Sequence, residues 1–168
     1  MAETLKLTES ESIEIVGSGP EGLEVEATYD PDGSAPPKHL HPSQDERFRV
    51  LDGKLRAVVG HEQRELAAGD ELDIPRGTAH QMWNPYDGPA RVSWTTSPAG
   101  RTEDWFRAID ALVRAGRAGG PGGALSFAAL LDEYGDTFRL AVGPGPVVGG
   151  AVKALGLVGR LTGHGPGR

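Results

Sequence analysis

The sequence predicts an all-β barrel with a C-terminal α-helical extension, and three observations lead to this prediction. Apolar and polar residues alternate with a period of two along residues 11–96, and short Gly/Pro/Asp clusters separate the alternating runs. After residue 98 the apolar residues recur with a helical period. We therefore expect residues 1–98 to form the barrel with an N-terminal strand. Residues 99–168 should form a helical extension with Gly/Pro-rich breaks.

The expected strands are short, and turn residues punctuate them. Short strands at regular spacing favour a sandwich or barrel over β-α-β units. Asp52-Gly53 lies between two of the runs and predicts a hairpin, because both central positions of such a turn favour positive φ. The expected strands are Ile13–Val16, Leu23–Tyr29, Phe48–Val50, Leu55–Val59, Glu71–Ile74, Ala79–Trp83 and Arg91–Thr96.

Two helices are expected beyond the barrel. Thr102 is the expected N-cap of the first helix, and the second is expected to start at Ser126 after a break over residues 115–123. The Gly143-Pro144-Gly145-Pro146 run should end the second helix. The favoured interpretation is that both apolar faces pack on the barrel as a lid. The alternative places Val147–Arg160 on a membrane surface or in a dimer interface. The apolar residues of the two faces are Trp105, Phe106, Ile109, Leu112 and Val113, then Phe127, Leu130, Leu131, Tyr134 and Phe138.

Composition narrows the possible functions. The chain of 168 residues has the length of about one domain, and its net charge of −7 argues against a nucleic-acid partner. It has no cysteine, so disulfides and thiolate metal sites are excluded. We expect no membrane span because no run of 18 apolar residues occurs. The N-terminus lacks the apolar core of a signal peptide, so we expect a cytoplasmic protein.

Three histidines and one glutamate form the candidate site. His39 and His41 are two residues apart and would point to the same face of a strand. Glu46 shares its strand parity with Phe48, and His80 lies on a separate strand that a barrel can bring close. Together they predict a site for one divalent transition metal with nitrogen and oxygen ligands. His61, in a Gly-His-Glu-Gln loop, and His164, in a Gly-rich tail, are expected to lie outside it.

Ten positions in two clusters resemble the two motifs of the cupin superfamily, as in small single-domain bacterial members. The resemblance covers about residues 11–98 and implies a jelly-roll barrel with a metal near its open end. It also implies that His39, His41, Glu46 and His80 are the ligands, and that the chain forms a homodimer. The matching positions are Gly33, His39, His41, Glu46 and Gly53, then Gly69, Pro75, Gly77, His80 and Asn84.

The ligand set leaves coordination positions open for water or substrate, and it suits Fe, Mn, Ni or Zn. Strand parity places Tyr29, Phe48, Met82 and Trp94 near the ion as the expected substrate pocket. Asn84 is expected to orient His80 or a neighbouring loop by a hydrogen bond. No side chain stands out as a general base. The metal itself, with bound water or O2, is therefore expected to do most of the chemistry.

The favoured function is a metal-dependent enzyme of dioxygenase or oxidoreductase type that acts on a small, partly apolar organic molecule. Few cations have inward parity, which counts against a phosphorylated sugar as substrate. Two alternatives stay open: a non-catalytic sensor or binding module for a small molecule, and a metal-dependent isomerase of a sugar or keto acid. The fold does not choose among these functions.

Overall fold

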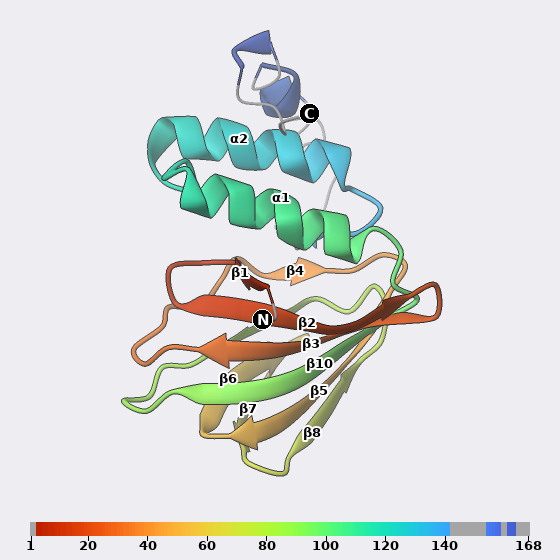
Figure 1. Cartoon of the computed structure of the whole chain (residues 1–168), viewed down its shortest axis with the longest axis vertical. Helices are drawn as coiled ribbons and strands as arrows, with labels where there is room; N and C mark the ends of the chain where they lie inside the picture. Colours follow the sequence, from red (N-terminus) through yellow and green to blue (C-terminus); the bar gives the residue numbers. More distant parts are fainter. Residues whose placement is uncertain (1–2, 142–153, 159–160, 164–168) are drawn as a thin grey trace.

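The chain folds into two antiparallel β-sheets that face each other, with two helices across one end (Figure 1). The computed structural model describes residues 3–141, 154–158 and 161–163. The first sheet has the spatial order β1 (Thr4–Lys6), β2 (Glu11–Gly19), β3 (Gly22–Tyr29), β10 (Ala90–Ser97), β5 (Asp45–Asp52) and β8 (Glu71–Ile74). The second has the order β11 (Arg139–Leu140), β4 (His39–Leu40), β9 (His80–Trp83), β6 (Lys54–Val59) and β7 (Glu62–Ala67). The jelly-roll arrangement confirms the predicted all-β class with C-terminal helices.

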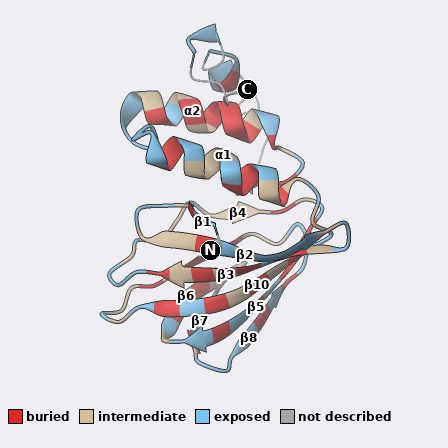
Figure 2. Ribbon diagram, in the orientation of Figure 1, coloured by how far each residue is buried: buried red, intermediate tan, exposed pale blue. Residues whose placement is uncertain are grey.

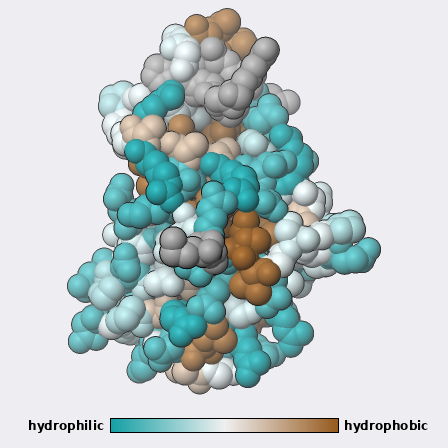
Figure 3. Space-filling view, in the orientation of Figure 1, coloured by the Kyte–Doolittle hydropathy of each residue, from teal (hydrophilic) through white to brown (hydrophobic). Residues whose placement is uncertain are grey.

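Period-two alternation places the core between the two sheets (Figure 2). On β10 the alternate residues from Ala90 to Thr96 are buried, and the residues between them are exposed or intermediate. Trp94 is paired in register with Val25 on one side and Phe48 on the other, so three strands contribute to one layer of the core. Hydrophilic residues cover most of the face seen in Figure 3. The long strands β3, β5 and β10 thus bury one face each, as their sequence pattern predicts.

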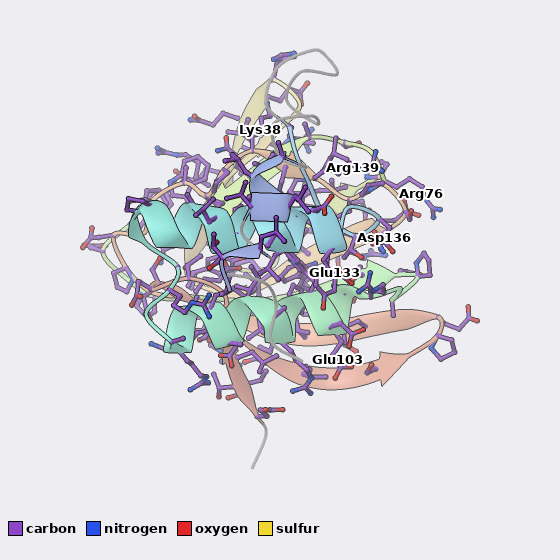
Figure 4. All side chains as sticks on the ribbon, turned by 90° about the horizontal axis from the view of Figure 1, so that it is seen from above. Lys38, Arg76, Glu103, Glu133, Asp136 and Arg139 are labelled. Carbon is purple, nitrogen blue, oxygen red and sulfur yellow. The ribbon has the colours of Figure 1, made fainter. Side chains whose placement is uncertain are left out.

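The helices α1 (Thr102–Arg114) and α2 (Gly120–Glu133) lie across the end of the barrel, as the view from above shows (Figure 4). Several of their buried side chains belong to the same apolar cluster as the strands, with Trp105 and Phe106 of α1 among them. The Lys6 backbone N–H also donates to the Asp110 carboxylate on α1, at 2.7 Å. Among the described residues, no helix is long and apolar enough to cross a membrane.

The helix boundaries differ from those predicted. The N-cap of α1 is Arg101, which makes no side-chain capping bond, and Thr102 is a buried first residue. The start of α2 lies at Gly120, ahead of Ser126, because Pro121 near the helix start has a φ suited to that position. Its end is Glu133, so Phe138 lies beyond it. Residues 143–146, most of Val147–Arg160, and His164 lie outside the described residues.

The prediction of a hairpin at Asp52-Gly53 is wrong. Although β5 and β6 are consecutive, they belong to different sheets, so this turn carries the chain from one sheet to the other. Gly53 has a φ of 76°, and a Cβ there would collide with the Pro89 carbonyl oxygen and the Ala90 backbone. The close approach of a third strand therefore requires glycine. A hairpin does join β6 to β7, through Gly60 and an exposed His61.

Gly53→Ala should lower the free energy of unfolding by about 2–4 kcal/mol, the sum of left-handed strain and overpacking. Gly60→Ala is the matched control, since Gly60 also has positive φ (61°) but open space around its Cβ position. That variant should lose only about 1 kcal/mol. Urea denaturation of both variants measures the difference. Equal losses of unfolding free energy in the two variants would show that the close approach to Pro89 does not add to the cost of Gly53→Ala.

Candidate metal centre

Three histidine rings meet at the end of the barrel covered by the helices. His39 on β4 is paired in register with His80 on β9, and His41 follows directly after β4. One ring nitrogen from each lies within 4.8 Å of those of the other two. His41 and His80 are only 4% and 3% exposed. The two strands thus bring the three rings to one point, although β4 itself has only two residues.

The protein backbone sets the orientation of all three rings. The Nδ1 atoms of His39, His41 and His80 lie 2.9, 2.8 and 3.0 Å from the carbonyl oxygens of Pro37, Thr137 and Thr78, in that order. A carbonyl oxygen only accepts hydrogen bonds, so each Nδ1 carries a proton in this arrangement. In the neutral ring the Nε2 atom then keeps its lone pair, which is the form that binds a metal.

Glu46 enters the cluster from β5 of the opposite sheet. It is 3% exposed, and its two oxygens lie 3.3 Å from His41 Nε2 and 3.0 Å from His80 Nε2. Trp94 Nε1 donates a hydrogen bond of 3.1 Å to Oε1 of the same carboxylate. The carboxylate therefore faces the same ring nitrogens that would bind an ion. Glu46 of the first sheet and the histidines held by the second sheet therefore form one polar cluster between the two sheets.

The electrostatics keep His39 and His41 neutral beside an ionised Glu46, whereas they favour the protonated form of His80. Burial and the neighbouring His80 and His41 lower the pKa of His39 to about 3, and burial also lowers the pKa of His41. Burial opposes ionisation of Glu46, but His41 and His80 outweigh it and hold the pKa of this carboxyl below its usual value. Burial lowers the pKa of His80 too, yet its contact with Glu46 raises it overall.

These residues fit a divalent metal ion. His41 Nε2 is buried and has no hydrogen-bond partner among the described residues, which is costly unless a cation or a ligand satisfies it. Three imidazole nitrogens and one carboxylate form a donor set suited to transition metals. The four residues would hold the ion, while the Pro37, Thr137 and Thr78 carbonyls would keep the rings in place.

A cavity of about 180 Å³ opens next to the histidines. The four residues expected to form the substrate pocket, Tyr29, Phe48, Met82 and Trp94, all line it. The helical part adds the aromatic side chains Trp105, Phe106, Phe127 and Phe138. No lysine or arginine is among the described residues that line the cavity. Its walls are therefore almost entirely apolar and aromatic.

The roof of this cavity contacts the metal centre directly. Phe138 stacks on His39 with ring centroids 4.5 Å apart, and Trp105 stacks on Phe138 at 4.7 Å. The Thr137 carbonyl that orients His41 comes from the same segment. The sequence predicts a lid, but the contacts of Phe138 and Thr137 with the histidines were not predicted. The aromatic residues on the predicted helix faces were the available signal.

Asn84 holds a loop and does not hold His80. Its side-chain amide donates to the carbonyl oxygens of Tyr29 and Gly88, at 3.2 and 2.7 Å, and its oxygen accepts from the Tyr86 N–H at 3.0 Å. His80 uses Thr78 instead. Of the two roles expected for Asn84, the structure contains the loop-orienting one.

Glu11 is a pocket residue that was not predicted from the sequence. It lies on β2 opposite Tyr29 on β3, and both line the cavity. Burial raises the pKa of Glu11 to about 7, and the negative charge of Glu46 acts in the same direction. The hydrogen bond from the Tyr29 hydroxyl lowers this pKa but does not outweigh burial. Burial likewise raises the pKa of Tyr29 well above its ordinary value. The available signal was strand parity, since Glu11 and the buried Ile13 point the same way.

Residues 25–96 match the family model described as "Cupin domain", over strands β3 to β10. This segment is a cupin domain. The resemblance in the ten motif positions is thereby confirmed. The solved structure of KdgF from Halomonas sp. shares the fold with a TM-score of 0.55 at 22% identity, and the match covers 60% of this chain and 92% of that one.

Two curated relatives match part of this chain. "Oxidoreductase iacF" of Pestalotiopsis fici is 45% identical over 51 residues, which are 30% of this chain and 25% of the relative. "Tetracenomycin polyketide synthase protein TcmJ" of Streptomyces glaucescens is 32% identical over 66 residues, 39% of this chain and 44% of the relative. The aligned segments thus span less than half of either relative.

His41→Ala should abolish stoichiometric metal binding by the cupin. At 100 times the dissociation constant, a bound ion adds about 2.7 kcal/mol of stability, and this increment should disappear in the variant. Metal analysis by mass spectrometry, and melting curves with and without chelator, measure both effects. His61→Ala is the control, because His61 is exposed on the β6–β7 hairpin. Retention of one ion per chain in His41→Ala would rule out the ligand assignment.

Trp94→Phe should weaken metal binding about 10–100-fold, the usual cost of losing a group that orients a ligand. The substitution removes the Nε1 hydrogen bond to Glu46 but keeps an aromatic ring. Competition titration with a chromophoric chelator measures the affinity. Trp105→Phe is the control, since Trp105 stacks on Phe138 in the roof. Equal affinities of the two variants would contradict a role for the Trp94 hydrogen bond.

Proposed function

We propose that this cupin is a mononuclear metal-dependent enzyme of dioxygenase or oxidoreductase type that acts on a small, partly apolar organic molecule. The observation that carries the proposal is the convergence of three oriented histidine rings on one buried carboxylate, at the edge of an aromatic cavity. A structural metal site would be closed by its ligands, whereas this one adjoins a cavity of about 180 Å³.

The proposed cofactor is one Fe, Mn, Ni or Zn ion held by His39, His41, Glu46 and His80. When bound, it would supply Lewis-acid or redox chemistry to a ligand in the cavity. The chain supplies the surroundings. The backbone carbonyls hold the three rings, Trp94 holds Glu46, and the roof aromatics exclude water, which strengthens electrostatic interactions inside.

The lining supports the proposed substrate class. Aromatic side chains provide flat apolar surfaces, and the absence of lysine and arginine among the described lining residues disfavours a phosphate group. The names of the two relatives, an oxidoreductase and a protein of polyketide synthesis, support a small organic substrate of this kind. The homodimer and the cytoplasmic location stay predictions from the sequence.

A second candidate is a metal-dependent isomerase of a keto acid. The observation that favours it is Glu11, a carboxyl in the same cavity whose pKa of about 7 suits proton transfer. Such an enzyme would move a proton within its substrate without consuming O2. Metal binding is common to both candidates, and oxygen uptake separates them.

The proposal is tested by anaerobic loading with Fe(II), followed by oxygen-electrode measurements across phenols, 1,3-diketones and thiols. At least one substrate should drive oxygen uptake matched by product formation, and His41→Ala should give only the background rate. Protein loaded with Zn(II) is the control for redox chemistry. Tight ligand binding without turnover under any metal would instead support the non-catalytic binding module.

A further inference from the structure

We propose that Glu11, hydrogen-bonded by Tyr29, is the proton-transfer group of the cavity and takes a proton from an acidic C–H or O–H of the bound molecule. The proposal rests on the proposed function in one respect: the cavity must bind a small organic substrate. It does not require O2 chemistry. It also assigns a catalytic side chain to a site for which the sequence offered only the metal.

The geometry places the Glu11 carboxyl in the cavity. Glu11 and Tyr29 are directly paired on neighbouring antiparallel strands, and such a pair has its side chains on the same face. That face is the inner one, because Ile13 on β2 and Ala27 on β3 are buried on it. Both Glu11 and Tyr29 line the cavity together with the three histidines. The Glu11 carboxyl and the three histidines therefore border the same cavity.

The backbone around Glu11 is well fixed. The N–H groups of Leu7 and Thr8 both donate to the Glu11 carbonyl oxygen, at 2.9 and 3.2 Å. The Asp30 N–H donates to the Ser10 carbonyl at 2.8 Å, which ties the adjacent turn to the end of β3. Leu7 and Thr8 also line the cavity. A fixed backbone limits the orientations of the Glu11 side chain, which suits a group that must contact its substrate in one geometry.

The surroundings of the carboxyl suit proton transfer near neutral pH. A carboxyl with a pKa of about 7 is populated both as base and as acid there, which is the condition for efficient general acid–base catalysis. The Tyr29 hydroxyl donates to the carboxylate and stabilises its ionised form. The other ionisable side chains near the carboxyl are Tyr29 on β3, Glu46 on β5, and His39, His41 and His80.

The proposed step is a balanced proton transfer. A C–H or O–H bond of the substrate breaks, its electron pair stays on the substrate as an enolate or oxyanion, and the proton forms an O–H bond on Glu11. Return of that proton to another atom of the substrate, or to water, restores the carboxylate. No oxidant or reductant takes part, so the step serves an isomerase directly and an oxygenase as substrate activation.

The first test observes the carboxyl itself. Infrared difference spectra of the full chain across pH should show a protonated-carboxyl C=O band that disappears with a midpoint near pH 7 and is missing from Glu11→Gln. Loading with Zn(II) should lower the midpoint, because a cation in the same cavity stabilises the carboxylate. Glu14→Gln is the control: Glu14 lies on the same strand, but its side chain is exposed. Absence of a Glu11-dependent band overturns the proposal.

The second test measures proton transfer without oxygen. Anaerobic Zn(II)-loaded protein should accelerate exchange of the central C–H of pentane-2,4-dione in D2O, followed by proton NMR. Glu11→Gln should lower this acceleration about 100-fold, the usual contribution of a general base, and Glu14→Gln should not change it. The wild-type rate should rise with pH as Glu11 ionises. In Tyr29→Phe the rise should move to higher pH, because the lost hydrogen bond had lowered the pKa of Glu11.

The outcomes separate this proposal from the proposed function. Exchange that depends on Glu11, without oxygen uptake on any substrate, supports the proton-transfer role and contradicts the oxygenase. Oxygen uptake, together with exchange that Glu11→Gln does not change, supports the oxygenase and contradicts the proton-transfer role. No acceleration by the wild-type protein overturns the proton-transfer role. The Glu11→Gln variant should fold, because glutamine has nearly the same shape as glutamate and can still accept the hydrogen bond from Tyr29. A melting curve of the variant verifies this.

Discussion

The buried Glu46 carboxylate is the group on which the arrangement of the site depends. Removing a carboxylate from water costs several kcal/mol unless partners compensate for it. Here the partners come from several elements: His41 after β4, His80 on β9 and Trp94 on β10. Because Glu46 belongs to one sheet and the histidines are held by the other, its compensation requires both sheets to meet at this end of the barrel. The cluster therefore constrains how the two sheets meet around the site.

The C-terminal part of the chain completes this cluster. β11 pairs with β4, so residues 139–140 hydrogen-bond beside His39, and the Thr137 carbonyl fixes the His41 ring. At the end of α2, Arg101 pairs with Glu133 at 2.8 Å and lies over the Tyr134 ring. This contact ties the segment after α2 to the start of α1. The segment after α2 thus contributes to the orientation of His41 and borders His39.

Local patterns explain which features could be predicted from the sequence. Strand parity was enough to place Phe48, Met82 and Trp94 in one cavity. Side chains alternate between the two faces of a strand in any strand order, so this prediction does not depend on the topology. The turn at Gly53 was misjudged because its local signal fits a hairpin and a crossover equally well; only the distant Pro89 decides between them. The Thr137 carbonyl was beyond prediction, because any residue has a carbonyl oxygen and its contact with His41 spans 96 positions. Glu11 was predictable from its parity with Ile13.

Glu11 in the cavity and Glu46 beside the histidines have opposite electrostatic environments. Burial acts on both, but two histidines face Glu46 and keep its pKa low, whereas Glu11 has only the Tyr29 hydroxyl to oppose burial and the charge of Glu46. When the pKa values of two neighbouring carboxyls differ in this way, one carboxyl stays ionised and the other exchanges protons. Enzymes use such differences to give chemically identical groups different roles. A bound cation would deepen the contrast by holding Glu46 ionised. The same burial that makes the centre suitable for a metal thus creates a proton acceptor beside it.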